Sequence, residues 1–149
     1  MFFFDLYCAA DTFDEGGLTQ MSGCGIVSNL RINDGSIIFK FGYPLGSSGY
    51  MVSVAQAIKL GILSIHRKYR TTSSSITIYS DECILNYLSD DVSVAPVHEE
   101  GCKDLILEIR ELIRPFGCKT SYFDLCSENM IEAKRIATIC QAKQKRYKE

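Results

Sequence analysis

Apolar and polar positions change their spacing about one third of the way along the chain. Before that point the apolar residues form short runs at 2–10, 22–30 and 36–43, which have the length and composition of β-strands. Asn33-Asp34-Gly35 lies between the second and third runs, and these residue types tolerate the positive φ angles of a hairpin turn. The pattern therefore predicts an antiparallel meander of three strands.

Beyond residue 49 the apolar positions recur at intervals of three and four, as they do in helices. The first helix is expected at 50–67, and Ser47 or Ser48 can cap its start. Three further helices are expected, at about 82–88, 100–114 and 129–147. In the last of these helices, the residues expected to face inward are Ile131, Ile136, Ala137 and Cys140.

Residues 75–80 form a strand that ends in a carboxylate. Ile76 and Ile78 fall on one face, Thr77 and Tyr79 on the other, and the strand leads directly into Asp81. With a fifth strand at 118–125, the order β-β-β-α-β-α-α-β-α predicts a mixed five-stranded α/β sheet with helices on both faces.

Right-handed crossovers would place the strands at 2–10 and 75–80 side by side in the centre of the sheet. Asp11 and Asp81 would then lie together at the carboxyl ends of these strands, where sites collect in open α/β sheets. The alternative is that Asp81 only caps the following helix.

Composition narrows the class of protein. The 149 residues are 46% apolar and 23% charged, as expected of one globular domain at 1–149. No run approaches the roughly 18 apolar residues of a membrane span, and the start lacks the basic region of a secretory signal. Seven scattered cysteines without a CxxC pair favour reduced thiols, so we expect an intracellular protein, cytoplasmic or nuclear.

Charge is unevenly distributed along the chain. The net charge is −2, but residues 1–100 carry 6 Lys and Arg against 11 Asp and Glu, whereas residues 101–149 carry 10 against 7. Basic residues also gather where the first helix ends. Arg67, Lys68 and Arg70 could contact a phosphate backbone, or they could simply suit the negative end of the helix dipole.

The order of the elements and several short motifs resemble the type 1 ribonuclease H family. The motifs are Gly23-Cys24-Gly25, the loop at 46–49, the strand at 77–81, Glu128-Asn129 and Ile136-Ala137. The resemblance covers nearly the whole chain and implies a ribonuclease H-like fold. It also implies that Asp11 and Asp81 bind metal and that Ser47 and Ser48 lie in a loop that contacts nucleic acid.

Enzymes of this family use four carboxylates around two divalent cations, and the present sequence departs from that set. Strict register would put Ala9, rather than Asp11, at the first position. Val52 stands where the first helix should supply a glutamate, and Val cannot bind a metal.

The last helix departs from the set as well. Lys134 or Ala133 falls at the position of its aspartate, depending on which motif is aligned, and Glu132 is the nearest carboxylate. Lys134 is either a surface lysine or a positive charge placed at the vacated metal position. Glu132 is either a substitute ligand or a solvated carboxylate near the start of the helix. Asp124 replaces a histidine of the family.

Three functions follow as hypotheses. The first is a ribonuclease H-like protein that interacts with nucleic acid but cleaves RNA–DNA hybrids weakly or not at all. The second is an active RNA–DNA hybrid endonuclease that uses Mg²⁺ or Mn²⁺ with a rearranged carboxylate set of Asp11, Asp81 and Glu132. A variant of it is a nuclease of the wider superfamily that acts on another nucleic acid with the set Asp11, Asp81, Glu82 and Glu132. The third is a non-catalytic module that binds a protein partner. We expect no cofactor in an inactive protein, and no membrane partner.

Overall fold

The computed structural model describes residues 2–31, 36–69, 74–80, 83–99, 101–122 and 127–148. Its strands are β1 (Phe2–Glu15), β2 (Leu18–Leu30), β3 (Ile37–Gly46), β4 (Ser74–Ser80) and β5 (Gly117–Tyr122). Its helices are α1 (Tyr50–Lys68), the 3-10 helix η1 (Cys83–Tyr87), α2 (Cys102–Ile113) and α3 (Glu128–Lys148). Within the described ranges, no helix is long and apolar enough to cross a bilayer.

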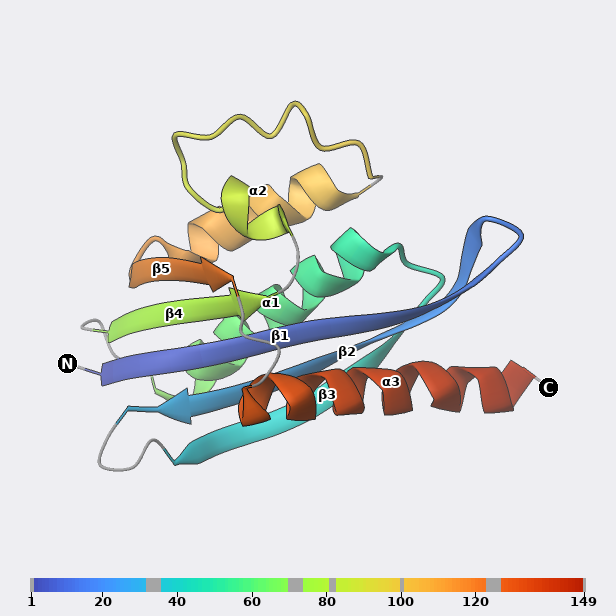
Figure 1. The fold of residues 1–149 in the computed structure, drawn as a ribbon. Helices are drawn as coiled ribbons and strands as arrows, with labels where there is room; N and C mark the ends of the chain where they lie inside the picture. The colour runs from blue at the N-terminus through green and yellow to red at the C-terminus, as the bar shows by residue number, and fades with distance from the viewer. Residues whose placement is uncertain are drawn as a thin grey trace.

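The strands form one mixed sheet in the order β3-β2-β1-β4-β5 (Figure 1). β2 pairs antiparallel with both β1 and β3, which is the predicted meander. β4 pairs parallel with β1, from Phe2 opposite Ser74 to Tyr7 opposite Tyr79, and β5 adds to β4 in parallel. The predicted fold class and the central placement of β1 beside β4 are therefore confirmed.

Helices cover both faces of the sheet (Figure 1). On one face, α1 and α2 close a core that contains the even-numbered side chains of β1 and β4, such as Leu6 and Ile78. On the other face, α3 lies across β1, β2 and β3. The alternation of buried and half-buried residues along β4 agrees with the faces that the period of two predicts.

α3 touches the sheet where β2 has glycine. A Cβ added to Gly25 would overlap the carbonyl oxygen of Ala133, and one added to Gly23 would lie 2.6 Å from the backbone nitrogen of Gln141. Close approach of the two backbones thus requires the Gly23-Cys24-Gly25 motif. The inward side of the helix carries mostly small or flexible side chains, namely Met130, Ala133, Ala137 and Gln141.

The prediction that Ile131 faces inward is wrong, because its side chain is 55% exposed. The glycines of β2 admit a helix backbone only where the helix itself presents small residues such as Ala133. This close approach sets the rotation of α3 about its axis, and it turns Ile131 towards solvent.

β1 and β2 are longer than the sequence pattern predicts. β1 continues to Glu15 instead of ending near residue 10, and β2 begins at Leu18. Gly16 and Gly17 have φ angles of 62° and 81° and form the turn between them. The mostly polar residues at 12–20, which the pattern leaves between two predicted strands, instead form a two-stranded ribbon that projects beyond the other strands (Figure 1). The predicted turn at 33–35 lies outside the described residues.

β3 is an edge strand, which explains why it continues through Pro44 instead of breaking there. Proline lacks an N–H group and is tolerated on a strand that has a neighbour on one side only. The pairing with β2 shifts register near each end of β3. The Lys68 ammonium donates a hydrogen bond to the Ile38 carbonyl oxygen at 3.0 Å. Irregularities and lysines of this kind protect an edge from pairing with another chain.

Candidate functional site

The candidate site lies where the parallel pairing of β1 and β4 ends. The last paired residues are Tyr7 and Tyr79, and beyond them β1 continues beside β2. Ala9 comes two residues after Tyr7 and is fully buried under α3, whereas Asp11 comes four residues after and is half-buried opposite Gly23. On this face of β1, alanine and not a carboxylate therefore occupies the first position after the parallel pairing.

Several predicted site residues lie outside the described part of the chain. They are Asp81, Glu82, Arg70 and Asp124, so the proximity of Asp11 and Asp81 stays a prediction. Among the residues that the structure describes, no three His, Cys, Asp or Glu side chains gather as metal ligands would. The described residues on their own therefore do not fit a site for two divalent cations.

The N-terminus of α1 approaches the same edge and is capped from a distant loop. The Glu99 carboxylate accepts hydrogen bonds from the backbone N–H groups of Met51 (3.3 Å) and Val52 (3.0 Å). The N-cap residue is Gly49, and a Cβ there would overlap the Glu99 carboxylate. A carboxylate is favourable at this end of the helix dipole.

The expectation that a serine caps α1 is wrong. Ser48 Oγ donates to the Leu45 carbonyl oxygen at 2.9 Å, and the helix begins after Gly49. Val52, in the first turn, packs its half-buried side chain against the core between α1 and the sheet. The start of α1 therefore contributes no carboxylate of its own to the edge.

Removal of the Glu99 cap should destabilise the protein by about 1 kcal/mol. We expect this loss in the free energy of unfolding of Glu99→Ala, measured by urea denaturation, because the loss of a helix cap costs roughly 0.5–2 kcal/mol. Gly49→Ala should also destabilise the wild type, because its methyl group overlaps the carboxylate, but much less in the Glu99→Ala background. Fully additive effects in this double-mutant cycle would contradict the contact.

Lys134 reaches the edge from α3. Its ammonium donates to the Ala10 carbonyl oxygen at 2.5 Å and to the Tyr50 hydroxyl at 3.3 Å. It also lies 5.1 Å from the centre of the Tyr50 ring, within the range of a cation–π attraction. One positive charge thus connects β1, α1 and α3, which favours the interpretation of Lys134 as a charge placed in the site over that of a surface lysine.

Glu132 lies on a different side of α3. It precedes Lys134 by two residues, which is a rotation of about 200° around the helix. Arg135 donates to its carboxylate from Nε at 3.1 Å and from Nη2 at 2.5 Å, and the Lys40 ammonium of β3 is 3.6 Å away. The bond to Arg135 is the main cause that lowers the pKa of the Glu132 carboxyl. These partners direct Glu132 towards β3, and the structure does not bring it to Asp11.

The candidate nucleic-acid residues lie at the two ends of α1. Ser47 is exposed and Ser48 half-buried at its start, whereas Arg67 and Lys68 are exposed at its end. Seventeen residues separate Tyr50 from Arg67, which corresponds to about 25 Å along the helix axis. The two groups are therefore separate surfaces.

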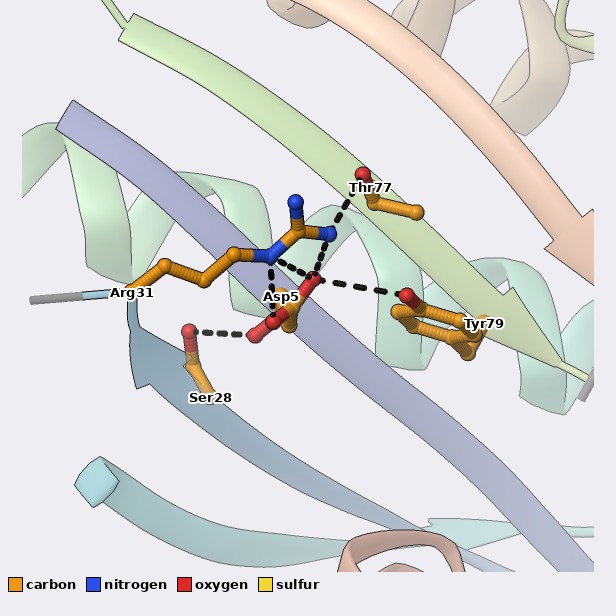
Figure 2. Close-up of polar contacts among 5 residues, drawn as sticks. All are labelled: Asp5, Ser28, Arg31, Thr77 and Tyr79. Atoms are coloured by element: carbon orange, nitrogen blue, oxygen red, sulfur yellow. Dashed lines mark hydrogen bonds and ion pairs between the residues drawn. The ribbon is translucent and has the colours of Figure 1, made fainter. Parts of the chain in front are cut away.

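An ion pair between a buried carboxylate and a half-exposed arginine, which the sequence interpretation missed, lies on the α3-side face of β1 (Figure 2). The Asp5 side chain is 9% exposed, and Arg31 donates to it from Nε at 2.9 and 3.0 Å and from Nη2 at 2.5 Å. Arg31 Nη2 also donates to Thr77 Oγ1 at 3.3 Å, and the Tyr79 hydroxyl to Asp5 Oδ1 at 3.5 Å.

The contacts of Asp5 connect β1, β4 and the end of β2. The hydrogen bond to Asp5 is the main cause that raises the pKa of the Arg31 guanidinium. Tyr7 stacks on Tyr79 with ring centres 4.7 Å apart, and burial raises the pKa of the Tyr79 hydroxyl. The sequence did contain a signal for this ion pair, namely Asp5 within an otherwise apolar central strand. A carboxylate buried in such a strand needs a hydrogen-bonding or cationic partner.

Comparison with known proteins supports the fold. No protein-family model and no curated protein matches the chain. Among solved structures, the N-terminal RNase H domain of a Mycobacterium tuberculosis protein is 12% identical, and the match covers 100% of both chains with a TM-score of 0.78. RNase H1 from Halobacterium salinarum is 14% identical, with 95% of this chain and 98% of that one covered and a TM-score of 0.70.

A third similar structure is LC11-RNase H1 in complex with an RNA/DNA hybrid. It is 14% identical and has a TM-score of 0.70, and the match covers 95% of this chain and 98% of that one. At these identities the likeness shows the fold, which is ribonuclease H-like as the sequence motifs imply.

Proposed function

We propose that this chain is a ribonuclease H-like protein that binds nucleic acid and has little or no activity towards RNA–DNA hybrids. The observation that carries the proposal is the Lys134 ammonium held against the Ala10 carbonyl oxygen at the end of the parallel strands. A fixed ammonium there repels divalent cations, which the hydrolysis of a phosphodiester by two metal ions requires.

Two further positions support a weakened site. Ala9 is buried at the first position on its face of β1 after the parallel pairing, and Val52 has no group that could bind a metal. Asp11 and Asp81 remain as candidate carboxylates for Mg²⁺ or Mn²⁺. Two carboxylates alone bind Mg²⁺ weakly, because a smaller number of charged ligands holds the ion less tightly.

An RNA–DNA hybrid or another nucleic acid is the partner that we propose. One similar structure, LC11-RNase H1, is a complex with an RNA/DNA hybrid. The present chain has the same fold and two candidate surfaces for such a contact. These surfaces are Ser47 and Ser48 at the start of α1, and Arg67 and Lys68 at its end. Arg70, which follows them in the sequence, is proposed to contribute to the second surface. The acidic balance of residues 1–100 restricts the contact to such local groups.

An active endonuclease that uses Asp11, Asp81 and Glu132 is the less favoured alternative. Glu132 already has two cationic partners, Arg135 and Lys40, and it projects from α3 on a side other than that of Lys134. Recruiting this carboxylate would break both ion pairs and require α3 to rotate about its axis. The glycines of β2 oppose such a rotation, because they fix the helix backbone against the sheet.

A cleavage assay tests the proposal. We expect the wild type to shift a labelled RNA–DNA hybrid in a binding assay, yet to give no product above the protein-free control with Mg²⁺ or Mn²⁺. Asp81→Asn and Asp11→Asn should behave as the wild type does in the cleavage arm. Robust cleavage that Asp81→Asn abolishes would overturn the proposal, and a lack of binding to any nucleic acid would favour a protein partner instead.

A further inference from the structure

A groove lies between β3 and the C-terminal end of α1. Its volume is about 240 Å³, and its walls are formed by Phe39, Phe41, Ser64, Arg67 and Lys68. Small-molecule sites usually measure about 300–1,000 Å³, so this groove suits one ring system with a charged substituent. It lies at the far end of α1 from Lys134 and the carboxylate edge.

The floor of the groove is aromatic. Phe39 and Phe41 alternate with Lys40 along β3, and both phenyl rings are half-buried against the core. Their ring centres are 5.7 Å apart and the ring planes are inclined by 44°. A planar ligand can stack on such a ring, and the stacking of a nucleobase on an aromatic side chain is worth roughly 1–3 kcal/mol.

The rim of the groove is cationic. Lys68 is held in place by its hydrogen bond to the Ile38 carbonyl oxygen of β3, at 3.0 Å, and keeps further N–H donors. Arg67 is exposed, and in the described part of the chain its guanidinium makes no hydrogen bond or ion pair. An unpaired guanidinium beside a fixed ammonium is a suitable receptor for a phosphate group.

We propose that this groove binds a single nucleotide unit, with the base on Phe39 and Phe41 and the phosphate at Arg67 and Lys68. The arrangement combines an aromatic platform with cations, which is how proteins hold unpaired nucleotides without reading their sequence. It therefore suits an unpaired nucleotide rather than a base pair. The inference deepens the proposed function and rests on it in part, because Arg67 and Lys68 also belong to one of the two proposed nucleic-acid surfaces. The groove and the carboxylate edge are nevertheless separate and can fail separately.

Titration of the ¹⁵N-labelled full chain with adenosine 5′-monophosphate tests the inference by nuclear magnetic resonance. We expect saturable shifts of the backbone amides at 37–41 and 64–68. Inorganic phosphate alone and adenosine alone should each bind at least about tenfold more weakly. Phosphate can contact only the cationic rim, and adenosine only the aromatic floor. Phe41→Leu and Arg67→Gln should each raise the Kd for the monophosphate about tenfold.

Lys103→Gln, on the exposed side of α2, serves as the matched control and should leave the Kd unchanged. The melting temperature of each variant shows whether weaker binding comes from unfolding of the protein or from loss of the contact with the ligand. Equal Kd values for inorganic phosphate and the nucleotide, shifts confined to other parts of the chain, or an unchanged Kd in Phe41→Leu would overturn the inference. None of these results depends on hybrid binding or cleavage, so the proposed function is judged by its own assay.

Discussion

Gly25→Ala is expected to lower the free energy of unfolding by more than about 3 kcal/mol. Overfilling a packed interior usually costs about 1–3 kcal/mol, because nearby side chains can move aside. At Gly25 the obstacle is backbone: the added Cβ would overlap the Ala133 carbonyl oxygen and lie 2.9 Å from the Ala137 nitrogen. Relief requires the whole of α3 to move away from β2, which would expose Ala9 and Val27 to water. Urea denaturation followed by circular dichroism measures the loss.

The matched control is Gly46→Ala, at the end of β3. Gly46 has a φ angle of 64°, but a Cβ there would meet no atom within 4 Å. The expected loss is therefore the conformational strain alone, about 1–2 kcal/mol. If Gly25→Ala were no more destabilising than Gly46→Ala, then α3 would not rest directly on the strand.

Arg31→Leu is expected to destabilise the protein by about 2–3 kcal/mol. Loss of one partner from a buried ion pair typically costs about 3–5 kcal/mol, since the other charge is left in the interior. The Asp5 side chain is 9% exposed and fits that case, whereas Arg31 is 48% exposed and part of its energy is screened by solvent. After the substitution, the Tyr79 hydroxyl is the remaining donor to the Asp5 carboxylate among the described contacts.

Two comparisons make this prediction specific. Arg114→Leu removes pairs with Asp90 and Glu111 on the surface, where both carboxylates are more than half exposed, and should cost less than about 1 kcal/mol. Adding Asp5→Leu to Arg31→Leu should recover much of the loss, because no buried charge remains. If Arg31→Leu and Arg114→Leu had equal effects, the Asp5 pair would contribute no more than a surface contact.

Where one local pattern decides the structure, the sequence predicted the fold well. The alternation at 75–80 gives the correct faces of β4, and apolar spacing from residue 50 gives a helix that ends one residue later than predicted. The order of elements was sufficient to place β1 beside β4, because right-handed crossovers leave few alternatives.

Predictions failed where a distant residue decides the local structure. Ser47 and Ser48 are good capping residues, but Glu99 reaches the helix start from a loop nearly fifty positions away. Ile131 has the largest apolar side chain near the start of α3, but Gly25 admits only Ala133 at close range. No window of sequence around either helix contains these partners.

The sequence predicts a candidate site at the carboxyl ends of β1 and β4, and the meeting of Asp11 and Asp81 there stays a prediction. Val52 already indicated that the first helix lacks its carboxylate. Lys134 was one of two candidates for the position of the aspartate in the last helix, and its role as an ammonium placed there was one of two interpretations. The length of β1 was beyond reach, because the end of that strand had to be inferred from the polar residues that follow it. Those residues instead continue the strand as a ribbon. Ala9, the residue that strict register indicated, comes closer than Asp11 to the end of the parallel pairing.

The contact between α3 and the glycines of β2 has a consequence for biosynthesis. A nascent chain completes β1, β2 and β3 by Gly46, but the helix that covers one face of them begins only at Glu128. As the ribosome extends the chain, Ala9, Val27 and the backbone around Gly25 remain without cover on that side. The meander therefore cannot mature as an independent folding unit, and its final packing must wait until α3 has left the exit tunnel.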